Sequence, residues 1–287
     1  MQHTCVGCLS NGDCKGTKPI CDLTSNTCMA CGQDSDCANV GPSICMTDGH
    51  CASDAETIYV QNSAAICTDT SSNPDGGSKN GTRTQPFCSM DPVAAFLSST
   101  RDLVVVNGTG ETITGGSWAY ANQVGSQLTI VGQQNPKIGS VSTPAFSLQN
   151  GSVYIRAVTF SSLSSIGINA SGGILALDHV TVTNCGAGGI LLSATAFDIE
   201  NTTISNNGPS SDLTWGGIRI QSLPATGSAK FDLVSITGND PSGMSCADGA
   251  APTGTGVFAS QNTSGQISNT CAITACMPAS PTCGSQQ

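Results

Sequence analysis

The chain has 287 residues, of which 34 are Gly, 10% are charged and 4% are aromatic, a composition that favours many short strands and tight turns over a helical enzyme core. The net charge of −10, with nine Lys plus Arg, argues against nucleic-acid binding because phosphate neutralisation needs a clustered basic face. No run of about 18 apolar residues occurs, so no membrane-spanning segment is expected.

Sixteen cysteines indicate an oxidising compartment. So many thiols are hard to keep reduced, and no single metal site would use them all. We therefore expect a secreted or cell-surface protein. Residues 1–20 hold no basic start followed by an apolar run, so the export signal is expected to lie outside this sequence.

A tandem cysteine repeat occupies residues 1–53, where nine of the sixteen cysteines lie. The stretches CVGCLSNGDCKGTKPICDLTSNTC and CMACGQDSDCANVGPSICMTDGHC superpose cysteine on cysteine, which indicates two copies of one unit. Cys5 is then the last cysteine of a preceding unit. We expect pairing within each unit, among Cys8, Cys14, Cys21 and Cys28 in the first and among Cys31, Cys37, Cys45 and Cys51 in the second.

Pairing within a unit has three possible patterns. The crossed pattern, Cys8 with Cys21 and Cys14 with Cys28, is preferred because pairing of adjacent cysteines would leave the two halves unlinked. Zinc binding is the alternative, since CxxC spacing occurs here, as at Cys5 and Cys8. With few apolar residues the unit depends on its crosslinks, each worth about 2–4 kcal/mol, and its expected role is a stalk or spacer.

Residues 54–287 form the second expected domain, which begins with TIYVQNSAAIC, GGSKNGTRTQPFCSMDPVAAFLSS and DLVVVNGTG. This succession resembles the opening of secreted right-handed parallel β-helix proteins of the pectin-lyase-like class. The resemblance implies an all-β fold of three-strand coils and, in that class, a carbohydrate cleft along one strand of each coil. The resembling residues are Tyr59, Val60, Gly81, Thr82, Pro86, Phe87, Ala94, Ala95 and the strand 103–106.

Three local features accompany this opening. Asp91 is expected to cap a helix that begins at Pro92 and closes the open end of the stack of strands. Cys67 and Cys88 stand on either side of a polar loop and are expected to pair across it. Within that loop, residues 69–77 place oxygen atoms at alternate positions as a calcium loop does, but the closing carboxylate is missing.

A six-residue pattern recurs as VTFSSL at 158, VTVTNC at 180, TTISNN at 202, VSITGN at 234 and CAITAC at 271. Each copy has an apolar strand before it, as in VYI and ILAL, and another after it, as in IGINAS, GGILLS, GGIRIQS and GVFASQ. The early spacing of 22 residues predicts three-strand coils, with insertions in particular turns. The expected inward columns are Phe160, Val182, Ile204, Ile236 and Ile273, and Val158, Val180, Thr202, Val234 and Cys271.

The outward positions of these hexamers form two expected columns of hydroxyl side chains. Such a grid resembles the ice-binding faces of some β-solenoids, where the spacing can match ordered water. Thr and Ser also suit any solvent-facing strand, so a plain structural role is the alternative. The columns hold Thr159, Ser161, Thr181, Thr183, Thr203, Ser205, Ser235, Thr237 and Thr274, with Ala272 as an interruption.

Long insertions at 206–215 and 238–255 precede strands that follow a hexamer, and they are expected to wall a ligand cleft. Arg219 is expected to point outward on such a strand because it lies between two inward Ile residues. Trp215 is expected either to stand at the rim as a sugar-stacking platform or only to cover the loop. The expected ligand-binding residues are Trp215, Arg219, Asp212, Asp240, Asp248, Asn169 and Phe258.

The catalytic motifs of the resembled class are mostly missing. Polygalacturonase-like enzymes have an Asp-Asp pair, a third Asp, a His between glycines and an Arg-x-Lys, of which GIRIQS keeps only Arg219. Pectate-lyase-like enzymes use calcium and a basic residue, so Arg219 with Asp212 and Asp240 is a candidate lyase set with Ca²⁺ as its cofactor. Asp178 and His179 are expected to be exposed turn residues.

These patterns favour a non-catalytic protein that binds a glycan or another cell-surface component, with no cofactor. A lyase that acts on acidic polysaccharide is the first alternative. An ice-binding or purely structural solenoid is the second. The ligand, the oligomeric state and the partner of Cys185 stay open at this point.

Overall fold

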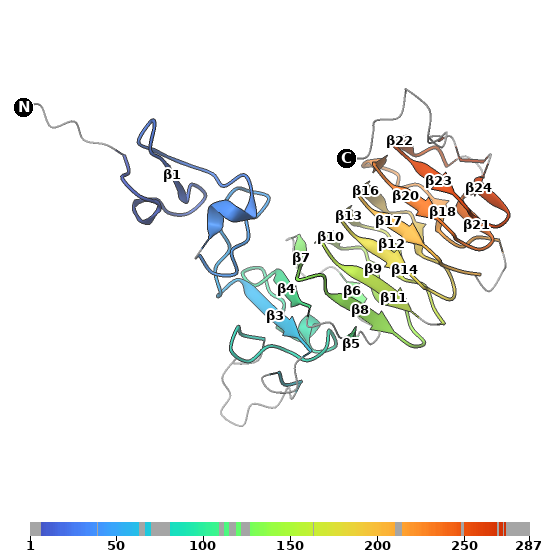
Figure 1. The fold of residues 1–287 in the computed structure, drawn as a ribbon, viewed down its shortest axis with the longest axis horizontal. Helices are drawn as coiled ribbons and strands as arrows, with labels where there is room; N and C mark the ends of the chain where they lie inside the picture. The colour runs from blue at the N-terminus through green and yellow to red at the C-terminus, as the bar shows by residue number, and fades with distance from the viewer. Residues whose placement is uncertain are drawn as a thin grey trace, which may run out of the picture. The chain divides into compact units, whose positions relative to one another are not determined.

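Most strands of the computed structural model belong to parallel sheets (Figure 1). The chain divides into two units, Met1–Thr57, called the module below, and Ile58–Gln287, called the solenoid. Among the described residues, no helix has the length and apolar character needed to cross a membrane. The structure describes residues 7–38, 40–62, 67–69, 81–108, 112–114, 119–121, 127–162, 164–209, 214–247, 250–268, 270–271 and 273.

The module contains two copies of one small repeat, as the sequence predicts. In each copy a 3-10 turn ends near an Asp whose carboxylate accepts hydrogen bonds from two preceding backbone N–H groups, at 2.9 Å each for Asp13 and at 2.8 and 3.1 Å for Asp36. These backbone hydrogen bonds lower the pKa of both carboxyl groups. The described elements are η1 (Asn11–Asp13), β1 (Ile20–Asp22), β2 (Thr27–Met29) and η2 (Asp34–Cys37).

Disulfides link the two halves of each repeat in the crossed pattern. In the first repeat Cys8 bonds to Cys21 and Cys14 to Cys28, which confirms the preferred pairing. The second repeat follows the same pattern, and the expected bridge in the solenoid is also present. The remaining disulfides are Cys31–Cys45, Cys37–Cys51, Cys67–Cys88 and Cys246–Cys271, the last of which the sequence did not predict.

Cysteines form the buried clusters of both repeats of the module, and Ile44 and Ala52 are buried beside them in the sequence. Cys8, Cys14 and Cys21 are at most 8% exposed and form the core of the first repeat. The core of the second repeat is likewise a cluster of cysteines, and Ile20 of the first repeat packs against it. The two repeats therefore stack through one aliphatic side chain placed on a pair of disulfides.

In the described part of the solenoid the strands form three parallel sheets, with eight, seven and seven strands. The first holds β3 (Thr57–Gln61), β4 (Leu103–Asn107), β7 (Leu128–Gln133), β10 (Ser152–Arg156), β13 (Ile174–Asp178), β16 (Ala196–Glu200), β19 (Ala229–Asp232) and β22 (Thr253–Thr255). The second holds β5 (Thr112–Thr114), β8 (Lys137–Ser140), β11 (Thr159–Ser162), β14 (Thr181–Thr183), β17 (Thr203–Ser205), β20 (Ser235–Thr237) and β23 (Phe258–Ser260). The third holds β6 (Ala119–Ala121), β9 (Phe146–Gln149), β12 (Ile168–Ser171), β15 (Ile190–Ser193), β18 (Ile218–Ser222), β21 (Ser242–Cys246) and β24 (Gly265–Ile267).

The coils stack in chain order, as the colour change from β7 to β24 shows (Figure 1). Each coil gives one strand to each sheet, so alternate residues of every strand point into a shared interior. Val182 pairs with Phe160 on one side and with Ile204 on the other, and all three side chains are fully buried. The interior is therefore one continuous apolar core, as the hexamer pattern predicts.

The structure corrects the register of the last two coils. GVFASQ does not follow the hexamer at 234 as a third-sheet strand. It supplies β23, which pairs with β20, and the third-sheet strand of that coil is β21. Accordingly Ala259, not Ile273, follows Ile236 in the inward column. Cys271, which was expected to end the other inward column, forms a disulfide with Cys246.

A second correction concerns the expected capping helix. Residues Val93–Phe96 form only a short 3-10 turn, η3, and Pro92 stands at its N-cap without a side-chain hydrogen bond. Asp91 therefore caps no α-helix here. The apolar side chains still cover the end of the core, since Val93 is fully buried and the Phe96 ring lies 5.1 Å from that of Phe87.

A buried ladder of asparagines runs along one corner of the solenoid. Asn207, Asn239 and Asn262 take the sixth hexamer position in three successive coils and are at most 6% exposed. The Asn239 side-chain oxygen accepts the backbone N–H of Asn207 at 3.1 Å and its Nδ2 at 3.0 Å, and Asn262 receives the same pair of bonds from Asn239. Each Nδ2 also donates at 3.0 Å to a carbonyl of the preceding coil, at Val182, Ile204 and Ile236.

Different residues close the two ends of the asparagine ladder. At the last rung, Gln266 Oε1 accepts Nδ2 of Asn262 at 2.8 Å and so takes the place of a further asparagine. At the first rung, Cys185 donates its backbone N–H to Asn207 Oδ1 at 3.0 Å, but its thiol cannot extend the amide pattern. The ladder satisfies polar groups that the coil corners would otherwise bury unpaired.

Candidate functional site

A groove of about 520 Å³ lies over β21 and β24 of the third sheet. Five of its lining side chains carry hydroxyl groups, and Ile267 and Pro241 add apolar surface. Its position is consistent with the expected cleft, because the long insertions before β18 and after β20 supply part of the wall. The described lining residues are Thr214, Pro241, Ser242, Ser245, Ser264, Gly265, Ile267 and Ser268.

One outward column of the third sheet leads into this groove. Asn169 pairs with Leu191, Leu191 with Arg219, and Arg219 with Ser245. The flanking Ile218 and Ile220 are fully buried, so the alternation predicted for this strand is confirmed. The predicted residues Asn169 and Arg219 therefore share one column with a residue of the groove lining.

Arg219 lies at the margin of the groove and is held in place. Its Nη1 donates a hydrogen bond to Thr214 Oγ1 at 2.7 Å, and Thr214 is itself a lining residue. Ser242 Oγ in turn donates to the carbonyl oxygen of Thr214 at 3.3 Å. This hydrogen bond fixes the orientation of the planar guanidinium group at the margin of the groove.

The burial of Trp215 favours the second of the two roles expected for it. Its side chain is only 4% exposed, and a Cβ atom placed on Gly188 would lie 2.3 Å from its ring. The ring therefore packs closely against Gly188, whose φ of +115° also favours glycine. A sugar needs an open aromatic face for stacking, so Trp215 acts as a cover for the loop and not as a platform.

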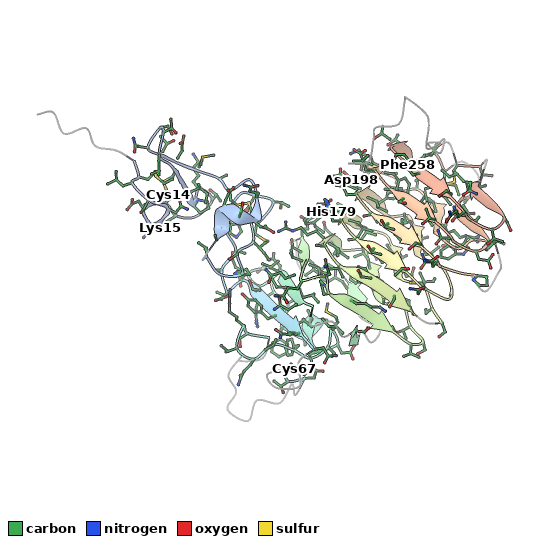
Figure 2. The ribbon with its side chains drawn as sticks, viewed as in Figure 1. Cys14, Lys15, Cys67, His179, Asp198 and Phe258 are labelled. Carbon is green, nitrogen blue, oxygen red and sulfur yellow. A yellow bond between two sulfur atoms is a disulfide. The ribbon has the colours of Figure 1, made fainter. Side chains whose placement is uncertain are left out.

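The other predicted ligand residues do not all meet at the groove. Asp240 is exposed and directly precedes the lining residue Pro241. Phe258, labelled in Figure 2, was expected in the column of Arg219, but it pairs with Ser235 on the second sheet and that expectation is wrong. Asp212 and Asp248 lie outside the described residues.

The hydroxyl columns are present on the second sheet. Thr181 pairs with Thr159 and Thr203, and Ser205 pairs with Thr183 and Thr237. The hydroxyls of Ser205 and Thr183 lie 3.2 Å apart and are hydrogen-bonded. Ser235 continues the first column and Ser161 lies two residues beyond Thr159, whereas Thr274 is outside the described residues.

Two larger side chains bound this hydroxyl face. Lys137 pairs with Thr159 at one end of the first column, and Phe258 pairs with Ser235 at the other. The uninterrupted part of that column therefore spans the four strands from β11 to β20. Most of these hydroxyl side chains are partly exposed because neighbouring strands shield them. Ser161 is only 8% exposed, so its expected place on the exposed face is wrong.

Charged side chains gather on the first sheet instead. Arg156, Asp178, Glu200 and Asp232 follow one another in register, and Lys230 Nζ lies 3.2 Å from Glu200 Oε1. The side chains of Lys230 and Glu200 are 40% and 41% exposed, so their pairing contributes little stability. His179, labelled with Asp198 in Figure 2, lies 2.7 Å from Asp178 and has a side chain that is 69% exposed, which confirms its expected exposure. Asp178 is instead the last residue of β13 and is 27% exposed, so it is not the exposed turn residue that was expected.

The described cysteines leave one free thiol. Cys185 is fully buried and unbridged, and burial raises its pKa to about 12. Among the described residues, the clusters with metal-ligand spacing consist of cysteines, with sulfur atoms within 4.8 Å of one another. Those sulfurs form disulfides, whereas zinc binds thiolates, so the bonding favours the disulfide interpretation over zinc. The clusters are Cys8, Cys14 and Cys28, and Cys31, Cys37 and Cys45.

Comparisons of the chain with protein-family models, with curated proteins and with solved structures find no match. The parallel solenoid is thus established by strand pairing within the chain. The likeness to the pectin-lyase-like class rests on the residues of the opening segment alone.

Proposed function

We propose that the solenoid binds a glycan in the groove over β21 and β24 and does not cleave it. The observation that carries this proposal is the lining: five hydroxyl groups beside two apolar side chains. Sugars present alternating hydroxyls and C–H faces, which this mixture can hydrogen-bond and cover. The chain then acts as a secreted or cell-surface protein of the pectin-lyase-like class, in which the module serves as the stalk.

The described lining supplies binding groups rather than proton-transfer groups. None of its eight residues is a carboxylic acid, an imidazole or a thiol. Cleavage of a glycosidic bond by hydrolysis uses a pair of carboxyl groups, and elimination uses a base close to the sugar. Arg219, at the margin of the groove, is the described group on which a lyase would depend. Substitution of Arg219 therefore distinguishes a lyase from a protein that only binds the glycan.

The test is a binding screen on a glycan array with calcium present and with calcium chelated. Ser245→Phe should reduce binding at least tenfold, because Ser245 points outward and a ring there would fill the groove. Thr181→Phe places the same ring on the second sheet and should leave binding intact. Equal affinity of the Ser245→Phe variant and the parent chain would refute the groove.

A lyase would give a different result in the same experiment. It would release unsaturated product from an acidic polysaccharide, and Arg219→Ala would abolish the release. Calcium would be required for that activity. Binding without turnover in both calcium conditions is the outcome expected here.

The second sheet favours one further candidate function, which is binding of ice or ordered surface water. The supporting observation is the register, which aligns hydroxyl side chains across the strands from β11 to β20. Neighbouring rows then lie about 4.8 Å apart. Thermal hysteresis that Thr181→Phe removes and Ser245→Phe retains would support this candidate, and its absence in the parent chain would exclude it.

A further inference from the structure

His50 lies between two carboxylates at the end of the module. Its Nδ1 is 2.5 Å from Asp48 Oδ1, and its Nε2 is 3.1 Å from Glu56 Oε1. The second carboxylate oxygen of Glu56 accepts the backbone N–H of Ser53 at 2.7 Å and the Ser53 hydroxyl at 2.6 Å. His50 thus joins the last loop of the second repeat to the turn 53–56.

This arrangement depends on the protonation state of the imidazole ring. A neutral ring has one N–H and one bare nitrogen, so it can donate to only one carboxylate. The imidazolium has two N–H groups and can donate to Asp48 and Glu56 at once. When the proton leaves, one nitrogen lone pair faces a carboxylate oxygen and that contact becomes repulsive.

The surroundings of His50 favour the charged form. Burial lowers the pKa of the imidazole, but the hydrogen bond and charge of Asp48 and the charge of Glu56 outweigh burial and raise it. Burial raises the pKa of the carboxyl groups of Asp48 and Glu56. Hydrogen bonds from His50 to Asp48, and from Ser53 and His50 to Glu56, outweigh burial, so the pKa of each carboxyl group is lowered. Asp54 is the other acidic residue of the same turn, and the described ion pairs of His50 are with Asp48 and Glu56.

We propose that His50 is a proton-operated latch that closes the turn 53–56 in acid and releases it in base. The latch acts on the segment that leads directly into β3, since Thr57 Oγ1 donates to the carbonyl oxygen of Ser53 at 2.7 Å. A raised folded-state pKa contributes stability that is complete below the unfolded pKa, near 6.5, and is lost as pH rises through the folded value. The turn is therefore held most firmly in mildly acidic surroundings.

The test measures the imidazole of His50 and the amide of Ser53 by NMR between about pH 5 and pH 9, a span that brackets the ordinary titration of histidine. His50 should titrate above the ordinary value of histidine, near 6.5, because two carboxylates face its ring. The protection factor of the Ser53 amide against hydrogen exchange should fall at least threefold with the midpoint of His50. Expressing the result as a protection factor corrects the measured rate for the ordinary base catalysis of hydrogen exchange.

Two variants make the result decisive. His50→Gln should lower Ser53 protection at acidic pH to its alkaline level and abolish the pH dependence, while His179→Gln should change neither. Glu56→Gln keeps an acceptor for Ser53 but removes the charge, so it should lower the titration midpoint of His50. Disulfide mapping of each variant shows whether the module has folded.

Three outcomes would overturn the latch. They are a His50 midpoint at or below the ordinary value of histidine, near 6.5, Ser53 protection that does not change with pH in the parent chain, and pH-dependent protection that persists in His50→Gln. Each leaves glycan binding by the groove untouched, because the latch involves residues of the module alone.

Discussion

The module and the solenoid are both built from repeats, but different forces hold their repeats together. In the module most buried side chains are cystines, and each repeat is closed by two disulfides that link residues 13 or 14 positions apart. In the solenoid the buried groups are aliphatic and aromatic, and a side chain such as Val182 contacts coils on both sides. A defect should stay local in the module and spread along the stack in the solenoid.

The largest expected effect comes from a charge in the solenoid core. Val182→Asp would place a carboxylate in a fully buried position between Phe160 and Ile204, where nothing can pair with it. Such burial should cost more than about 4 kcal/mol of unfolding free energy. Thr181→Asp, one residue earlier and facing outward, should cost less than about 1 kcal/mol. Chemical denaturation followed by circular dichroism measures both, and equal losses would mean that the register is wrong.

Removal of one disulfide in the module should have the next largest effect, and a local one. Cys14→Ser combined with Cys28→Ser opens a loop of 14 residues, which should cost the first repeat about 3 kcal/mol. Hydrogen exchange read by mass spectrometry should increase in the first repeat and not in β10 to β20. Increased exchange throughout the solenoid would show that the two units unfold together.

A break in the asparagine ladder should cost less than either of these changes but should affect two coils. Asn239→Ala leaves the Nδ2 of Asn207 without its side-chain acceptor and the carbonyl of Ile204 without its donor. We expect a loss of about 2 kcal/mol. Asn206→Gly is the matched control, because Asn206 is exposed with a φ of 56° that glycine adopts readily. A control that destabilises as much as Asn239→Ala would mean that the ladder bonds add little.

The sequence predicted the repeat architecture where the apolar alternation was strong. Cysteine spacing gave both units of the module, and the hexamers gave the coils from β10 to β20 with the correct inward residues. The final coil was missed because β22, with the sequence TGT, is exposed throughout and needs no apolar pattern. Without it, GVFASQ was assigned to the wrong sheet.

The candidate site was less predictable, for two physical reasons. Trp215 is a rare aromatic residue next to a polar loop, and only the contact with Gly188 reveals that its ring is covered. The groove is lined by serines and a threonine, which are common throughout this chain, so no single residue marks it. The asparagine ladder did leave a signal, an Asn at the sixth position of TTISNN, VSITGN and VFASQN, but only the correct register turns that signal into a buried column.

The smallest expected effect tests whether the ladder can be lengthened. Cys185 occupies the same position as Asn207 one coil earlier, and its backbone N–H already donates to Asn207 Oδ1 at 3.0 Å. By the pattern of the other rungs, Cys185→Asn would bring an Nδ2 group to Asn207 Oδ1 and to the carbonyl of Phe160. Because the existing thiol makes only a weak contact with the carbonyl of Thr183 at 3.5 Å, the gain should be up to about 1 kcal/mol.

The variant Cys185→Val distinguishes the effect on stability of adding an amide to the ladder from the effect of removing the thiol. Valine fills the buried site without an amide, so it should leave stability unchanged within about 0.5 kcal/mol while Cys185→Asn raises the denaturation midpoint. A fall in the midpoint for Cys185→Asn but not for Cys185→Val would mean that this corner cannot accept a further amide. The solenoid would then contain two kinds of coil corner, one closed by amides up to Asn207 and one packed around the sulfur of Cys185.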